Sequence, residues 1–75
     1  MDITIISYGS LIDLLGQSST CIAADTDELI ANIHQRHPDF KNRKFVIAVN
    51  NTIIRKNTLL RQGDQVALMP PYSGG

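Results

Sequence analysis

The sequence has few of the residues that staple a small protein covalently or give it a strong surface field. Its single cysteine, Cys21, cannot form an internal disulfide, and one cysteine is typical of a protein from a reducing compartment. Seven basic and seven acidic side chains give no net charge, so nucleic-acid binding driven by counterion release has no evident source. No apolar run reaches the length of a signal-peptide core or a membrane span. We therefore expect a cytoplasmic protein that binds neither nucleic acid nor membranes.

A length of 75 residues excludes a two-domain enzyme, because chains form separate cores only at several times this length. Leucine, isoleucine, valine and phenylalanine nevertheless account for 22 of the 75 residues, which lies outside the composition of disordered chains. A domain of this size keeps a net stability of about 3–5 kcal/mol. The chain should fold, and its stability should depend on a well-packed core or on a partner.

The first third of the chain predicts two strands on either side of a small helix. Residues 3–6 are β-branched throughout, as in a strand at the centre of a sheet. Ser10 can cap a helix of about one and a half turns with its hydroxyl, and Gly16 can end it in a left-handed conformation. Residues 19–23 are typical of a second, half-buried strand. Because so short a helix is marginal in water, its leucines must pack on the sheet.

The middle of the chain predicts the main helix. Asp25 can cap its first turn, with Glu28 reaching back from the third position, and Pro38 ends it after about three turns. Its buried stripe is expected to comprise Leu29, Ile30 and Ile33. The basic stretch over residues 41–44 is interpreted as a solvated loop and not as a phosphate site.

The last part of the chain predicts three strands. Residues 45–49 and 52–55 flank an Asn-Asn pair that tolerates the positive φ angles of a tight turn, so they should form an antiparallel hairpin. Residues 66–69 form a final apolar strand, suited to the sheet centre, that ends where a Pro-Pro pair lacks amide donors. The whole pattern predicts an α+β domain over residues 1–69, with a mixed five-stranded sheet, one main helix and one short helix.

No group of side chains within this domain has the spacing of a catalytic, cofactor or metal site. His34 and His37 lie three apart on the predicted main helix, but no further ligands have a diagnostic spacing to them. Cys21 lies in the middle of a strand, where a thiol is usually inert. The acidic cluster at the start of the main helix is explained by capping and comprises Asp25, Asp27 and Glu28. We therefore expect no metal, no directly bound cofactor and no catalytic activity of the chain on its own.

The most informative segment is the predicted extended tail over residues 70–75. Six extended residues reach about 20 Å, and a prolyl root lowers the entropy that the chain loses when it enters a channel. Two terminal glycines lack Cβ atoms and fit a narrow passage. An alternative is an inert, frayed terminus. The tail comprises Pro70, Pro71, Tyr72, Ser73, Gly74 and Gly75.

Chemistry at Gly75 requires activation from outside the chain. A terminal carboxyl has a pKa of about 3.5, so at neutral pH it is an anion and a poor electrophile. Adenylation would convert it into a mixed anhydride with a good leaving group. A sulfur donor could then produce a thiocarboxylate, or a lysine amine could form an isopeptide bond.

Three segments resemble the MoaD/ThiS sulfur-carrier family, in particular its molybdopterin synthase small-subunit branch. Residues 63–75 are similar to the C-terminal signature of that branch, which has a Gly-Asp turn, an apolar strand, Pro-Pro and a terminal Gly-Gly. Residues 8–16 resemble the short helix after the first strand, which the shorter thiamine-type carriers lack. The Arg-His-Pro sequence at residues 36–38 is also similar. The resemblance spans almost the whole chain.

This resemblance implies a ubiquitin-like β-grasp fold in which the first and last strands pair in parallel at the sheet centre. It implies that an E1-like, ATP-dependent adenylating enzyme activates Gly75, which then carries the sulfur as a thiocarboxylate. Gly74 would be the slim penultimate position, and the arm inserted into a partner would comprise Pro70, Pro71, Tyr72 and Ser73.

The implied partner is the large subunit of molybdopterin synthase, in a heterotetramer. There the sulfur is passed to a cyclic pyranopterin monophosphate precursor, and the basic catalytic residues belong to the large subunit. Met69 and Tyr72 depart from the family pattern, and Tyr72 adds bulk to the arm. The alternatives are a sulfur carrier for thiamine synthesis or tRNA thiolation, a ubiquitin-like protein modifier, and a binding module with an inert tail.

Overall fold

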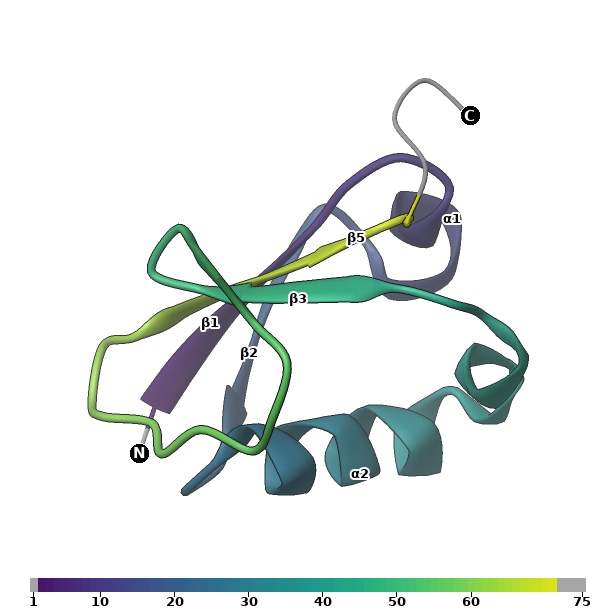
Figure 1. Cartoon of the computed structure of the whole chain (residues 1–75). Helices are drawn as coiled ribbons and strands as arrows, with labels where there is room; N and C mark the ends of the chain where they lie inside the picture. Colours follow the sequence, from purple (N-terminus) through teal and green to yellow (C-terminus); the bar gives the residue numbers. More distant parts are fainter. Residues whose placement is uncertain (1, 72–75) are drawn as a thin grey trace.

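The structure, a computed structural model, describes residues 2–71 as five strands and three helical segments (Figure 1). In chain order these are β1 (Asp2–Ser7), α1 (Leu11–Leu15), β2 (Ser18–Ile22), α2 (Thr26–Arg36), the 3-10 helix η1 (Pro38–Asn42), β3 (Val46–Val49), β4 (Thr52–Ile54) and β5 (Gln65–Met69).

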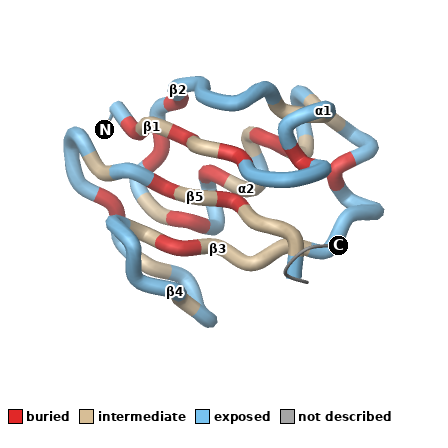
Figure 2. The backbone as a smooth tube through the Cα atoms, turned by 90° about the horizontal axis from the view of Figure 1, so that it is seen from above, coloured by how far each residue is buried: buried red, intermediate tan, exposed pale blue. Residues whose placement is uncertain are grey.

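The five strands form one mixed sheet with the order β2-β1-β5-β3-β4 (Figure 2). The first and last strands, β1 and β5, pair in parallel at the centre, and every other neighbouring pair is antiparallel. The predicted mixed five-stranded sheet and its parallel central pair are therefore confirmed. Because the last strand is central, its backbone pairs with a neighbouring strand along both edges.

The core lies between the sheet and α2, which crosses one face of it (Figure 1). Alternate residues of a strand point to the same face, so Ile3 and Ile5 of β1 face the helix together with Val66 and Leu68 of β5. Each of these four side chains is buried, and they pack in one cluster with α2.

The predicted cap of α2 is confirmed. The carboxylate of Asp25 accepts a hydrogen bond from the Glu28 backbone N–H at 2.8 Å, and the Glu28 carboxylate accepts one from the Ala24 N–H at 3.0 Å. The helix ends at Arg36, before Pro38, as predicted. Of the predicted buried stripe, two residues are fully covered, whereas Ile30 is only half-buried.

The short helix α1 forms as predicted, but its predicted serine cap is wrong. The Ser10 backbone is already helical, with φ −65° and ψ −16°, and its hydroxyl makes no capping hydrogen bond. The carbonyls of Tyr8 and Gly9 instead accept the first helical N–H groups. Gly16 has the predicted positive φ, 82°, but its ψ of 165° is not that of a left-handed helical residue. The helix is held by Leu11, which is buried in the core.

The predicted loop at residues 41–44 begins inside η1, which the sequence patterns did not indicate. Phe40 is fully buried, and its ring lies 4.8 Å from that of Phe45 and 5.7 Å from that of His34, between centroids. This aromatic contact explains why the chain turns inward here. The basic side chains of residues 41–44 are exposed, as predicted.

The predicted hairpin of β3 and β4 is confirmed, and Asp64 ties its turn to β5. Asn50 and Asn51 have φ angles of 48° and 72°. The Asn50 side-chain amide donates to Asp64 Oδ1 at 3.0 Å, and the Arg61 N–H donates to Asp64 Oδ2 at 2.8 Å. These two hydrogen bonds favour the ionised carboxylate and lower the pKa of Asp64 below its ordinary value of 3.8.

The Asp64→Asn variant should show a stability loss that depends on pH. A carboxyl whose pKa is lower in the folded state stabilises the fold above its unfolded pKa, and this contribution disappears as the pH falls through the folded pKa. Wild type should therefore be the more stable protein at pH 7, and the gap should close as the pH falls below about 4. Urea unfolding midpoints across this pH range measure the gap. A gap that stays constant down to acidic pH would contradict this account of Asp64.

Candidate functional site

The candidate site begins at the end of β5, beside α1 (Figure 1). The strand ends at Met69 and is followed by Pro70, which is half-buried, and Pro71, which is exposed. The Leu68 carbonyl accepts a hydrogen bond from the Tyr8 N–H at 3.0 Å, so the chain just after β1 runs next to the end of β5. The segment between β1 and α1 therefore forms the wall at the root of the tail.

Gly9 allows this wall to approach the tail closely. It has a φ of 58°, in the left-handed region, and a Cβ atom built on it would lie 2.8 Å from Pro70 Cγ. A real side chain essentially never makes a contact that short, so any residue with a Cβ would have to displace the proline ring. The contact fixes where the tail leaves the fold. Sequence patterns could not reveal it, because 61 positions separate the two residues.

A Gly9→Ala substitution should destabilise the protein more than Gly63→Ala. Both glycines have positive φ angles, so each alanine pays the cost of the left-handed region, about 1–2 kcal/mol. Only position 9 adds a clash, because nothing lies within 4 Å of a Cβ at Gly63. Thermal unfolding measures the difference, and the carbon chemical shifts of the Pro70 ring report its displacement. Equal losses at both positions, with an unchanged Pro70, would contradict the proposed contact.

The predicted site residues fall into two groups. Pro70 and Pro71 lie at the root of the tail, as described above. The other four predicted positions lie outside the described residues, and their roles stay predictions: Tyr72, Ser73, Gly74 and Gly75.

The titratable side chains within the domain do not form a reaction centre. Cys21 is buried in β2, and burial raises the pKa of its thiol, an effect that the nearby charge of Arg36 only partly offsets. The thiol is therefore neutral at physiological pH and a poor nucleophile. His34 is on α2 as predicted, whereas His37 lies just beyond its end, as the C-cap. Within residues 2–71, no three potential ligands from His, Cys, Asp and Glu gather as a metal site would require.

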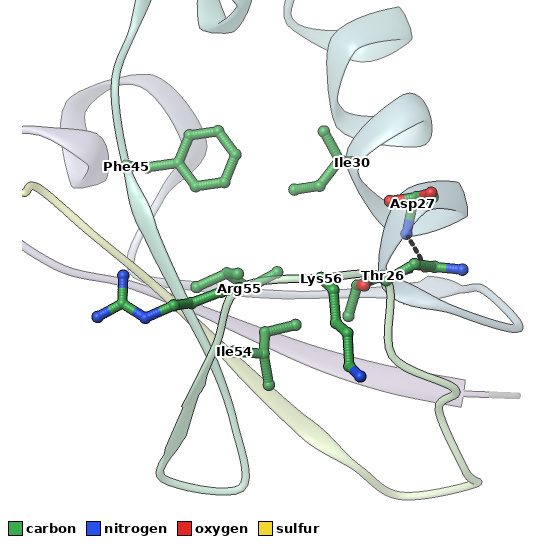
Figure 3. A pocket seen from close by; sticks show the side chains of 9 residues that line it. Thr26, Asp27, Ile30, Phe45, Ile54, Arg55 and Lys56 are labelled. Atoms are coloured by element: carbon green, nitrogen blue, oxygen red, sulfur yellow. Dashed lines mark hydrogen bonds between the residues drawn. The ribbon is translucent and has the colours of Figure 1, made fainter.

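An open cavity of about 370 Å³ lies between α2 and the β3–β4 hairpin (Figure 3). Its apolar wall includes Ile30, Phe45 and Ile54. The side chains of Arg55 and Lys56 point away from that wall, so they do not converge on a common point. At the other end of the cavity, the Asn57 side-chain carbonyl accepts hydrogen bonds from the Thr26 hydroxyl at 3.2 Å and the Asp27 N–H at 2.9 Å, so these polar groups pair with one another.

Among residues 2–71, none of the helices is both long enough and apolar enough to traverse a bilayer.

Residues 6–75 match the model of the ThiS family, so the match begins in β1 and runs through the tail. The chain belongs to the ThiS family, and its ubiquitin-like β-grasp fold agrees with that membership. The resemblance inferred from the sequence motifs is thus confirmed.

Two related proteins and one solved structure are similar to this chain over most or all of its length. The molybdopterin synthase sulfur carrier subunit of Escherichia coli K12 is 30% identical over 80 residues, covering 97% of this chain and 99% of that protein. The subunit of the same name from Chlamydomonas reinhardtii is 39% identical over 56 residues, covering 69% and 68%. A chain in the complex of subunits 1 and 2 of the molybdopterin-converting factor from Helicobacter pylori is 31% identical, with a TM-score of 0.78 and full coverage of both chains.

Proposed function

We propose that this protein is the sulfur carrier subunit of a molybdopterin synthase and is not catalytic by itself. The observation that carries the proposal is the match to the Escherichia coli sulfur carrier subunit over almost the full length of both proteins. The similarity to a chain of the molybdopterin-converting factor complex supports a large synthase subunit as the partner.

The reactive group in this proposal is the terminal carboxylate of Gly75. A carboxylate oxygen attacks the α-phosphate of ATP bound to an E1-like adenylating enzyme, which forms an acyl-adenylate and releases pyrophosphate. A sulfide-level donor, as hydrosulfide, then attacks the acyl carbon, AMP leaves, and the terminus becomes a thiocarboxylate. In the large subunit this sulfur attacks a carbon of the cyclic pyranopterin monophosphate precursor and displaces an oxygen from it, which forms a thioester with the tail. Water then hydrolyses the thioester at the acyl carbon, so the sulfur stays on the precursor and the Gly75 carboxylate is restored. The chain itself holds neither ATP nor another cofactor.

The last strand ends at Met69, six residues before the proposed reactive terminus, which supports this role. The Cα radius of gyration of the protein is 11.3 Å, and residues 70–75 can extend about 20 Å. The tail can thus enter a deep pocket in the partner while the sheet and α2 stay outside. The contact between Gly9 and Pro70 provides a fixed starting point for that arm. We place the protein in the cytoplasm, where ATP and a reduced sulfur donor are both present.

Affinity purification of the full chain from its own cells tests the proposal. It should recover a large synthase subunit and an E1-like adenylating enzyme. The matched control is the chain without Gly74 and Gly75, which keeps the folded surface but has a shorter arm. The adenylating enzyme should no longer adenylate this shortened chain. Recovery of ladders of lysine-linked conjugates, without a large synthase subunit, would instead identify a protein modifier.

A further inference from the structure

The two edges of the sheet differ in how well they are protected from pairing with another chain (Figure 2). The edge strand β4 has only three residues and follows a tight turn. The opposite edge strand, β2, has five residues, Ser-Ser-Thr-Cys-Ile, with no charge and no proline. Natural edge strands are usually protected by shortness, charges, prolines or bulges. The β2 edge is longer than that of β4 and contains neither a charged residue nor a proline, so it is open to an added strand.

The hydrogen-bond pattern shows which groups of β2 face outward. The Ser7 N–H donates to the Gln17 carbonyl at 3.0 Å, and in an antiparallel pair such bonds recur at every second residue. The backbone groups of Ser18, Thr20 and Ile22 therefore point away from β1. The Ile22 carbonyl is taken by the Asn32 side-chain amide at 3.1 Å. Within residues 2–71, the outward amide and carbonyl of Thr20 have no hydrogen-bond partner.

A groove lies beside these outward groups, between β2 and α2. It has a volume of about 570 Å³, and its lining includes Thr20, Cys21 and Ile22 from the strand. Ile22 is 69% exposed, and it follows the buried Cys21 in the strand, so its side chain lies on the sheet face away from α2. A smaller cavity toward the end of α2 shares Cys21 and Arg36 with the groove and adds Ile33 to its lining. An extended chain placed along β2 would thus have a ladder of hydrogen bonds along its edge, the groove on the α2 side and the exposed Ile22 side chain on the other side.

The charge at the groove selects the kind of segment that fits. Arg36 lines both cavities, so it lies where they meet. Among the described residues that line the groove, Asp2 is the one acid, and it lies at the Ile22 end of β2, its partner in register. The smaller cavity, toward Ser19, has Arg36 in its lining and no acid among the described residues. A carboxylate on the incoming chain would complement Arg36. A second copy of this protein pairing through β2 would bring no acid, because that strand has none.

We propose that the edge of β2 binds an extended, acidic segment of another protein as an additional strand. Main-chain hydrogen bonds to Ser18 and Thr20 supply the pairing. An apolar side chain of the segment covers Ile22 on the sheet face away from α2, and a carboxylate on the opposite side of the segment meets Arg36. This binding mode is separate from the sulfur chemistry of the tail, since β2 and β5 are not neighbours in the sheet.

The test is a nuclear magnetic resonance titration of the full chain, labelled with nitrogen-15. The probe is the capped peptide Val-Thr-Val-Thr-Val-Asp-Asp, and the matched probe ends in Lys-Lys. We expect amide shifts confined to residues 18–22 and 32–36, with the acidic peptide binding about two- to fivefold more tightly, the range of an exposed ion pair. The Arg36→Gln variant should remove this preference, whereas Arg55→Gln, at the other edge of the sheet, should keep it.

Two further measurements separate strand addition from simple charge attraction. The acidic peptide with N-methyl groups on alternate amides should lose binding to the wild-type protein. The Thr20→Pro variant, which removes an outward N–H and leaves the bonds to β1, should lose it as well. Shifts at β3 or β4, equal binding of the methylated peptide, or concentration-dependent shifts at β2 without any peptide would overturn the proposal. A chain lacking Gly75 should bind the peptide normally, so this result is independent of the proposed function.

Discussion

Deletion of Gly75 should abolish sulfur transfer while leaving the folded domain intact. The reactive carboxyl would move back by one residue, about 3.5 Å, and would no longer reach the position that the full-length tail reaches. Among residues 2–71, the last strand ends at Met69 and the last buried core residue is Leu68, so we expect the deletion to leave these core contacts in place. The midpoint of thermal unfolding should therefore stay within about 4 °C of wild type. Transfer is measured with the large subunit, the adenylating enzyme, ATP and a sulfur donor.

The matched control for this deletion is Ser73→Ala, which keeps the length of the tail and its terminal glycine. It should retain transfer to within a few-fold, because the arm still delivers the same group to the same depth. Full transfer by the shortened chain would contradict a role for Gly75 as the sulfur bearer. A large loss of stability on deletion would contradict the separation of the tail from the fold.

The Leu68→Asp variant should fail to fold. Leu68 is 0% exposed and lies in the central strand, where it pairs in register with Ser7 of β1 and Ile47 of β3. An unpaired carboxylate there loses its hydration with no compensating partner, at a cost of more than about 4 kcal/mol, comparable with the whole stability of so small a domain. Far-ultraviolet circular dichroism and amide shift dispersion measure the loss of structure.

Gln65→Asp is the control for that substitution. It introduces the same side chain into the same strand, at a position that is exposed. We expect this variant to fold, with an unfolding midpoint close to that of wild type. A native-like spectrum for Leu68→Asp would mean that the central strand tolerates a buried charge, contrary to the packing described above.

Local signals in the sequence were sufficient to predict most of the secondary structure. The Asn50-Asn51 pair determines its own turn because both residues accept positive φ angles, and Asp25 caps α2 through a residue three positions away. The end of β5 follows from the proline at position 70, which has no amide to donate. Such features depend on neighbours in the chain, so patterns over a few residues can predict them.

Features that depend on distant contacts could not be predicted in this way. Phe40 lies among charged residues, and only its packing against Phe45 makes η1 part of the core. Ser10 has the chemistry of a cap, but the carbonyls of the preceding two residues take that role. The central place of β5 was suggested by its apolar composition, whereas its parallel pairing with β1 came from the family resemblance and not from periodicity.

At the candidate site, too, the features that lie in one stretch of the sequence were predictable and those that depend on distant contacts were not. The tail was found from its sequence because a Pro-Pro root and a Gly-Gly end are linear features. Gly9 was missed as part of the site because its role depends on contact with Pro70 across the fold. The β2 edge was missed as well, since the exposure of a strand edge depends on strand order, which the pattern of residues did not determine.

The mass of the intact protein isolated from its own cells tests most directly whether the chain carries sulfur on its terminus. The sulfur carrier account predicts two populations, one with the mass of the plain sequence and one heavier by the difference between a sulfur and an oxygen atom. The added mass should map to the C-terminal peptide and disappear when Gly75 is deleted. A single population at the unmodified mass, in cells that contain the adenylating enzyme and a sulfur donor, would contradict it.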